Sequence, residues 1–186
     1  MDGKSMFSEQ TAAGWLLIVS GVVFTVGGLL FTGRAILKWP MAAAPAYLRW
    51  ERGFVIAALL TAVIGLVLLE RMLEAAGDRI LAPSGMALFL IGAVLVIVAE
   101  TSYLTRQEWT YPPIVAFVVL AFLGQAVFGA ALLRMGLLPG WIGWATILWN
   151  LGWLVVLPLA RPQDMYFPWL HYAAPVLIGI ALLSRR

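Results

Sequence analysis

Six long apolar runs determine what this chain can fold into. Each run has about 20 largely apolar residues, the length that a helix needs to cross the hydrocarbon of a bilayer. The runs are continuous rather than alternating, which predicts helices and not barrel strands. Of the 186 residues, 63% are hydrophobic and 11% are charged, a composition too apolar for a soluble domain of this size. The expected spans are 11–32, 53–73, 84–104, 113–133, 139–159 and 166–183.

The sequence therefore predicts an all-α, polytopic integral membrane protein, in which residues 1–186 form a single domain of six transmembrane helices. The connections between the spans are all too short to hold a soluble domain. We expect the first span to be retained rather than cleaved as a signal peptide, because it is long and no small-residue cleavage pattern follows it. The expected location is the inner membrane of a bacterium.

The charges exclude one class of partner and leave the orientation open. The net charge of +3 is spread over short loops and forms no basic stripe, so we expect no nucleic-acid partner. Six spans place both termini on one side, with six lysines and arginines on each side. The positive-inside rule therefore gives no orientation. The two sets are Lys4, Arg71, Arg79, Arg134, Arg185 and Arg186, and Arg34, Lys38, Arg49, Arg52, Arg106 and Arg161.

Small residues recur at heptad spacing along two of the spans. The first span has Gly14, Gly21 and Gly28 on one face, and the third span repeats the pattern from Gly85 through Gly92. Small residues let helices approach closely in a membrane, where packing holds the helices together. Both faces are predicted to point at neighbouring helices.

The segment 33–52, between the first two spans, mixes cations with aromatic rings and prolines. We interpret it as an interfacial crossing, with rings at headgroup level and cations reaching phosphates, in which prolines interrupt any long helix. The residues concerned are Arg34, Lys38, Trp39, Pro40, Pro45, Tyr47, Arg49, Trp50 and Arg52.

Polar residues at membrane depth are costly and are therefore candidates for function. Glu100 lies about 6 Å inside the end of the third span, and His171 lies a similar distance into the sixth. Odd spans leave the membrane where even spans enter it, so both residues share one half of the bilayer with Arg34, Tyr103 and Arg106. We expect Glu100 to pair with Arg34 or Arg106, or to hydrogen-bond His171. The simpler interpretation, which we favour, is that these residues are structural.

The fifth span carries a second candidate feature. Trp149 and Trp153 lie one turn apart, around Asn150, and two such rings can line a slot for a flat or isoprenoid ligand. Asn150 on this span and Gln125 on the fourth are more simply interhelical hydrogen bonds.

Two functions of different classes follow. The favoured one is a non-enzymatic membrane subunit or binding module for lipid or another hydrophobic ligand. The alternative is an intramembrane enzyme or proton-coupled carrier, with Glu100 and His171 as catalytic residues. Expected partners are membrane lipids, a hydrophobic small molecule, and another membrane protein or a second copy of the chain. The candidate ligand-binding residues are Arg34, Glu100, Tyr103, Arg106, Trp149, Asn150, Trp153 and His171.

No cofactor or metal is expected. The chain has one histidine and no cysteine, which excludes thiolate metal sites and paired-histidine haem ligation within one chain. The zinc-protease, nucleophile-elbow, P-loop and dinucleotide motifs are also missing from the sequence.

Overall fold

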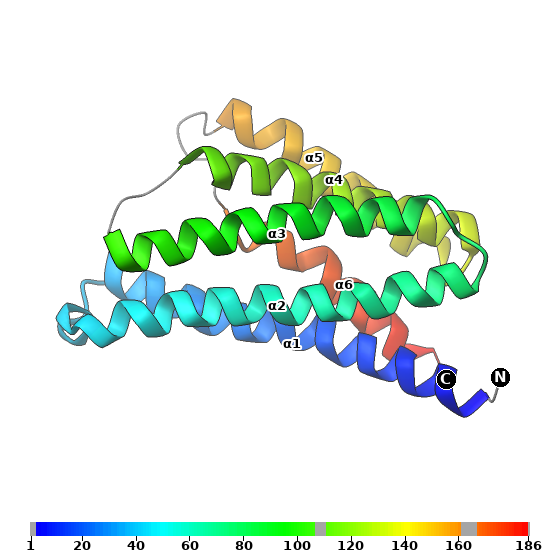
Figure 1. Cartoon of the computed structure of the whole chain (residues 1–186), viewed down its shortest axis with the longest axis horizontal. Helices are drawn as coiled ribbons and strands as arrows, with labels where there is room; N and C mark the ends of the chain where they lie inside the picture. Colours follow the sequence, from blue (N-terminus) through cyan, green and yellow to red (C-terminus); the bar gives the residue numbers. More distant parts are fainter. Residues whose placement is uncertain (1–2, 107–110, 161–166, 186) are drawn as a thin grey trace.

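Six α-helices make up most of the computed structural model, which describes residues 3–106, 111–160 and 167–185 (Figure 1). Within these ranges there is no β-strand, and one short 3-10 helix precedes the second α-helix. The predicted all-α fold class is therefore confirmed. The elements are α1 (Gly3–Ala35), η1 (Pro40–Ala43), α2 (Pro45–Ala75), α3 (Leu81–Arg106), α4 (Tyr111–Met135), α5 (Gly140–Ala160) and α6 (Leu170–Ser184).

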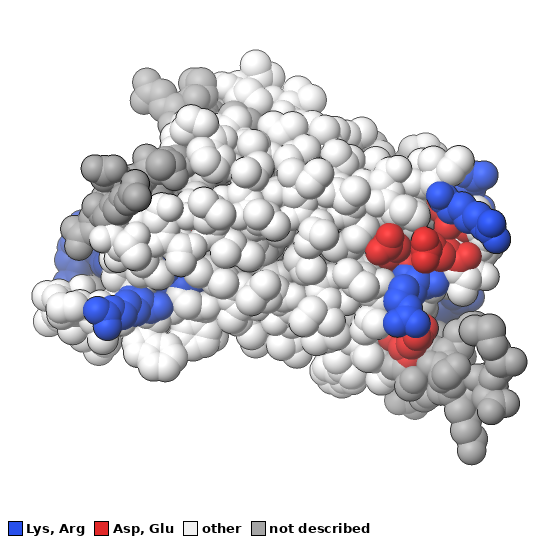
Figure 2. All heavy atoms as spheres, viewed as in Figure 1, with Lys and Arg blue, Asp and Glu red and all other residues white. Residues whose placement is uncertain are grey.

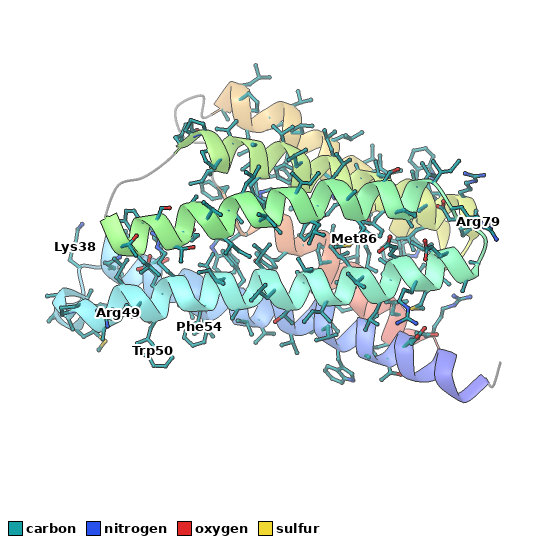
Figure 3. The ribbon with its side chains drawn as sticks, in the orientation of Figure 1. Lys38, Arg49, Trp50, Phe54, Arg79 and Met86 are labelled. Atoms are coloured by element: carbon teal, nitrogen blue, oxygen red, sulfur yellow. The ribbon has the colours of Figure 1, made fainter. Side chains whose placement is uncertain are left out.

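The helices have the lengths and the charge distribution of a membrane bundle. Helices α1 to α5 are each long and apolar enough to cross a bilayer, whereas α6 is apolar but has only 15 residues. Figure 2 shows charged side chains gathered toward two ends of the molecule, with uncharged atoms between them. In Figure 3, Lys38 and Arg49 lie at one end and Arg79 lies at the other. An uncharged belt between two charged ends is what a multi-pass membrane protein presents to hydrocarbon.

The helices pack as two groups of three. In one group, α1 packs against both α2 and α6, and in the other, α4 packs against both α3 and α5. The groups meet along α2 and α3, which lie side by side in Figure 1. They also meet along α5 and α6, where the contact is sparser. The bundle therefore has two seams, and the polar side chains described below lie at or near them.

The predicted packing role of the heptad glycines is confirmed. Gly14, Gly21 and Gly28 all face α6, because a Cβ added at any of them would lie within 2.8 Å of an α6 side chain or of Trp169, which precedes that helix. In the other group, a Cβ on Gly124 of α4 would lie 2.7 Å from the carbonyl oxygen of Gly85 on α3. These helix pairs approach so closely that only glycine fits between them.

Helix α2 begins eight residues earlier than the sequence analysis expected, at residue 45 instead of 53. Pro45 starts this helix instead of interrupting it, since a proline in the first turn removes no helical hydrogen bond. The expectation that Pro45 interrupts a helix is therefore wrong, whereas the position of 33–52 at headgroup level stays a prediction. Tyr47 is buried and donates its hydroxyl to the carbonyl of Leu30 at 2.9 Å, while Trp50 is exposed and points away from the bundle (Figure 3).

Candidate functional site

Four charged side chains form a continuous series where α1, α2 and α3 meet. We call Arg34, Glu51, Arg52 and Glu100 the charge chain. Arg34 donates through Nε and Nη2 to the two oxygens of Glu51, at 2.6 and 2.8 Å. Arg52 pairs with Glu51 through Nη2 at 3.2 Å and donates from Nη1 to both oxygens of Glu100, at 3.0 and 3.2 Å. Arg52 thus bridges the carboxylates of Glu51 and Glu100. With two arginines and two glutamates, the charge chain has no net charge.

The charge chain is almost completely shielded from its surroundings. Glu51 and Glu100 are each 1% exposed and Arg52 is 7% exposed, so only the Arg34 side chain, at 28%, reaches the surface. The guanidinium of Arg52 also lies over the ring of Tyr103, 4.9 Å from its centre, which adds a cation–π contact. Charges this deeply buried are tolerated only when they are paired. The charge chain therefore holds α3 against α2 and α2 against α1.

Two of the three partners that were expected for Glu100 are wrong. Glu100 pairs with Arg52 and Arg34 pairs with Glu51, so the expected pair of Glu100 with Arg34 is wrong. The expected hydrogen bond between Glu100 and His171 is also wrong, because neither ring nitrogen of His171 has a partner among the described residues. The third alternative, Arg106, lies outside the described side chains.

Glu51 and Arg52 were missed as site residues, although the sequence carries a signal for both. Once Pro45 is read as a helix start, each residue falls on a heptad stripe that is otherwise apolar and buried. A charged residue on such a stripe is predicted to be buried with a partner. The two stripes are Glu51, Ala58, Gly65 and Met72, and Arg52, Leu59, Leu66 and Leu73.

A second group of polar side chains lies among α4, α5 and α6. We call Gln125, Asn150 and His171 the polar cluster; all three are buried. The imidazole of His171 lies against two rings, 4.1 Å from Phe122 and 4.9 Å from Phe117 between centres. Within the described part of the chain, Oε1 of Gln125, Oδ1 of Asn150 and both ring nitrogens of His171 have no hydrogen-bond partner.

Two hydrogen bonds join the first turn of α6 to the helices beside it. Trp149 on α5 donates Nε1 to the carbonyl of Leu170 at 2.8 Å, and Gln125 on α4 donates Nε2 to the carbonyl of His171 at 2.9 Å. The interhelical role predicted for Gln125 is thus confirmed. Asn150 differs, because its Nδ2 donates at 2.7 Å to Thr146, one turn back on its own helix.

Pro175 explains why α6 needs the hydrogen bond from Gln125. This proline lies inside α6 and has no N–H, so the carbonyl of His171, four residues earlier, loses its helical donor. The amide of Gln125 supplies that donor from the neighbouring helix. In a bilayer no water is present to donate to the carbonyl of His171. The amide of Gln125 therefore compensates for Pro175.

The two tryptophans of α5 form a ring pair, as their spacing predicted. Trp149 and Trp153 meet edge to face, with ring centres 5.8 Å apart. Asn150 between them in the sequence is fully buried, whereas Trp149 is partly exposed and holds α6 through its N–H. The ligand-binding role predicted for these residues, and for Arg34, Glu100 and Tyr103, stays a prediction.

The polar cluster is joined to α1 by the residue that follows His171. Tyr172 stacks on Phe24 of α1, with ring centres 4.5 Å apart. Among the described residues, no three histidine or acidic side chains gather closely enough to hold a metal ion. The arrangement therefore combines an ion-paired clamp with a separate group of buried polar side chains, some of whose atoms make no hydrogen bond to the described residues.

Comparisons of the chain with protein-family models, with curated proteins and with solved structures found no match.

Proposed function

We propose that this protein is a non-enzymatic membrane module that binds a hydrophobic ligand among α4, α5 and α6. The observation that carries the proposal is the set of unpartnered polar atoms in the polar cluster. A buried donor or acceptor without a partner costs about 1–3 kcal/mol in a protein, and the apolar medium of a bilayer offers no water in compensation. A ligand that pairs with these atoms recovers that free energy.

The polar cluster favours a ligand with a hydroxyl group on an apolar body. A neutral imidazole provides one donor and one acceptor, while Oε1 of Gln125 and Oδ1 of Asn150 only accept. A hydroxyl can donate to one of these oxygens and accept from His171. The rings of Phe117 and Phe122 beside the imidazole suit an apolar or planar body. Isoprenoid and other lipid alcohols have this chemistry.

The test compares the lipids that co-purify with two variants. Asn150→Leu and His171→Phe keep side-chain bulk but remove unpartnered polar atoms, and each is expected to lower the ratio of ligand to protein about tenfold. Mass spectrometry of extracts from detergent-purified protein measures this ratio. Ser20→Ala is the matched control, since Ser20 is equally buried but its hydroxyl is already bonded to Leu17.

A different result for the same two variants would contradict ligand binding at the polar cluster. If the two variants unfold at higher temperature than the parent and keep the same lipid content, the polar atoms are only a structural cost and the binding proposal is wrong.

The location and the partners belong to the same proposal. We place the protein in the inner membrane of a bacterium, because helical bundles with long apolar helices are typical of such membranes, whereas bacterial outer membranes contain barrels. Lipids, a second copy of the chain or another membrane protein would cover the outer face of α5. That face carries exposed apolar side chains, among them Trp144, Leu148, Val155 and Leu159.

The proton-coupled carrier or intramembrane enzyme has weaker support. Both oxygens of Glu100 accept hydrogen bonds from Arg52, and His171 makes no hydrogen bond to Glu100, so the two residues do not form a direct path for a proton. If Glu100 exchanges protons, Glu100→Gln abolishes pH-driven flux in proteoliposomes. If the protein is a binding module, Glu100→Gln leaves the ligand content of folded protein unchanged.

A further inference from the structure

A groove lies between the start of α5 and the end of α6, at the opposite end of the bundle from the charge chain. Its volume is about 210 Å³. We call it the α5–α6 groove. Its walls include Trp141 and Ile142 from α5 and Leu177, Ile180 and Ala181 from α6, and Arg185 lies at its rim.

Helix packing on both sides explains why this space is not filled by the protein. At this level α6 packs closely against α1, where a Cβ on Gly179 would lie 2.7 Å from the carbonyl oxygen of Gly14. In the same way α5 packs closely against α4, where a Cβ on Gly143 would lie 2.8 Å from the carbonyl oxygen of Gly129. Each helix approaches its own neighbour, and the seam between α5 and α6 stays open.

The charge at the groove is of one sign. Among the residues that the structure describes, Arg185 is the only charged one that lines the groove, and none of the carboxylates described there does so. Its Nη1 donates to the carbonyl of Leu137 in the turn between α4 and α5, which fixes the guanidinium at the rim. A guanidinium has five N–H donors, so this bond leaves donors for an anion.

The walls of the groove are turned toward the medium around the bundle. Trp141 is 62% exposed and Ile180 is 51% exposed, and both are apolar. Tryptophans at helix ends lie at the level of lipid headgroups, with hydrocarbon beyond them. A molecule in the α5–α6 groove would therefore contact apolar walls on the hydrocarbon side and the guanidinium of Arg185 at headgroup level.

We propose that the α5–α6 groove holds one acyl chain of an anionic membrane lipid, whose phosphate lies against Arg185. Sites for drug-sized ligands have volumes of about 300–1,000 Å³, so the groove suits a single chain better than a ring system. Basic pockets between membrane helices are a known way to hold anionic headgroups. This proposal does not depend on ligand binding at the polar cluster.

The test measures lipid retention by native mass spectrometry, with the full chain in nanodiscs of phosphatidylglycerol or phosphatidylcholine with identical acyl chains. We expect the parent protein to retain phosphatidylglycerol preferentially. Arg185→Gln is expected to lower bound phosphatidylglycerol about fivefold and to leave phosphatidylcholine unchanged. Arg134→Gln is the matched control, because Arg134 is exposed at the same end of the bundle but does not line the groove.

A second variant tests the acyl chain separately from the charge. Ala181→Phe fills the groove while keeping Arg185, so it is expected to lower retention of both lipids, with folding checked by circular dichroism. The proposal is overturned if the parent retains both lipids equally, if Arg134→Gln matches Arg185→Gln, or if Ala181→Phe has no effect. Displacement of the lipid by inorganic phosphate alone would also overturn it, because the site would then recognise a free anion.

Discussion

Arg52→Met is expected to lower the free energy of unfolding by about 3–5 kcal/mol, the usual cost of removing one partner of a buried ion pair. Glu100 is 1% exposed and receives two hydrogen bonds from Arg52, so the variant removes both hydrogen bonds and the positive charge beside a buried carboxylate. Glu51 is affected less, because it keeps both hydrogen bonds from Arg34. Denaturant titration of the purified protein in mixed micelles measures the loss.

Two further variants separate the ion pair from the rest of the side chain. Arg49→Met removes an exposed arginine on the same helix and is expected to change stability by less than about 0.5 kcal/mol. The double variant Arg52→Met/Glu100→Leu is expected to be more stable than Arg52→Met alone, since no buried charge is left unpaired. Equal stability of Arg52→Met and Arg49→Met would contradict the clamp assigned to the charge chain.

Gly124→Ala is expected to destabilise the protein by about 1–3 kcal/mol, the range for overpacking a dense interior. The added methyl would lie 2.7 Å from the carbonyl oxygen of Gly85 and 3.0 Å from the backbone nitrogen of Phe89. Backbone atoms cannot rotate away as a side chain can, so α3 and α4 must separate. The same denaturant titration measures the effect.

Gly152→Ala provides a control of opposite sign. Beyond its own turn of helix, none of the described residues has an atom within 4 Å of a Cβ at Gly152, and the residue is inside α5. Alanine is favoured over glycine in a helix by about 1 kcal/mol, so this variant is expected to be as stable as the parent or more stable. A loss of stability at Gly152 as large as that at Gly124 would mean that the close approach of α3 and α4 is not the cause.

The fold could be predicted from the sequence because its main determinant is local. A run of about 20 apolar residues becomes a helix in a bilayer whatever its neighbours are, since each backbone group must find its partner within the segment. The heptad glycines also marked packed faces correctly, from Gly14 through Gly28 and at Gly85. The spacing of the glycines did not show which helix packs against each face.

The candidate site was harder to predict because its partners are distant in the sequence. Glu100 and Arg52 are 48 residues apart, and their pairing depends on α2 and α3 lying side by side. The early start of α2 was decisive, since it moves Arg52 from an expected loop into a buried turn of helix. Sequence spacing placed Glu100 and His171 in one half of the membrane but gave no information on the distance between them.

The hydrogen bond from Gln125 to the carbonyl of His171, four residues before Pro175, limits the order in which these residues can change during evolution. Exchange of Pro175 for alanine would restore the missing N–H and release α6 from its dependence on α4. Leucine at position 125 would then cost little stability, whereas the same leucine beside the proline would leave the buried carbonyl of His171 without a donor. The order of the two substitutions therefore matters, and the proline must go first.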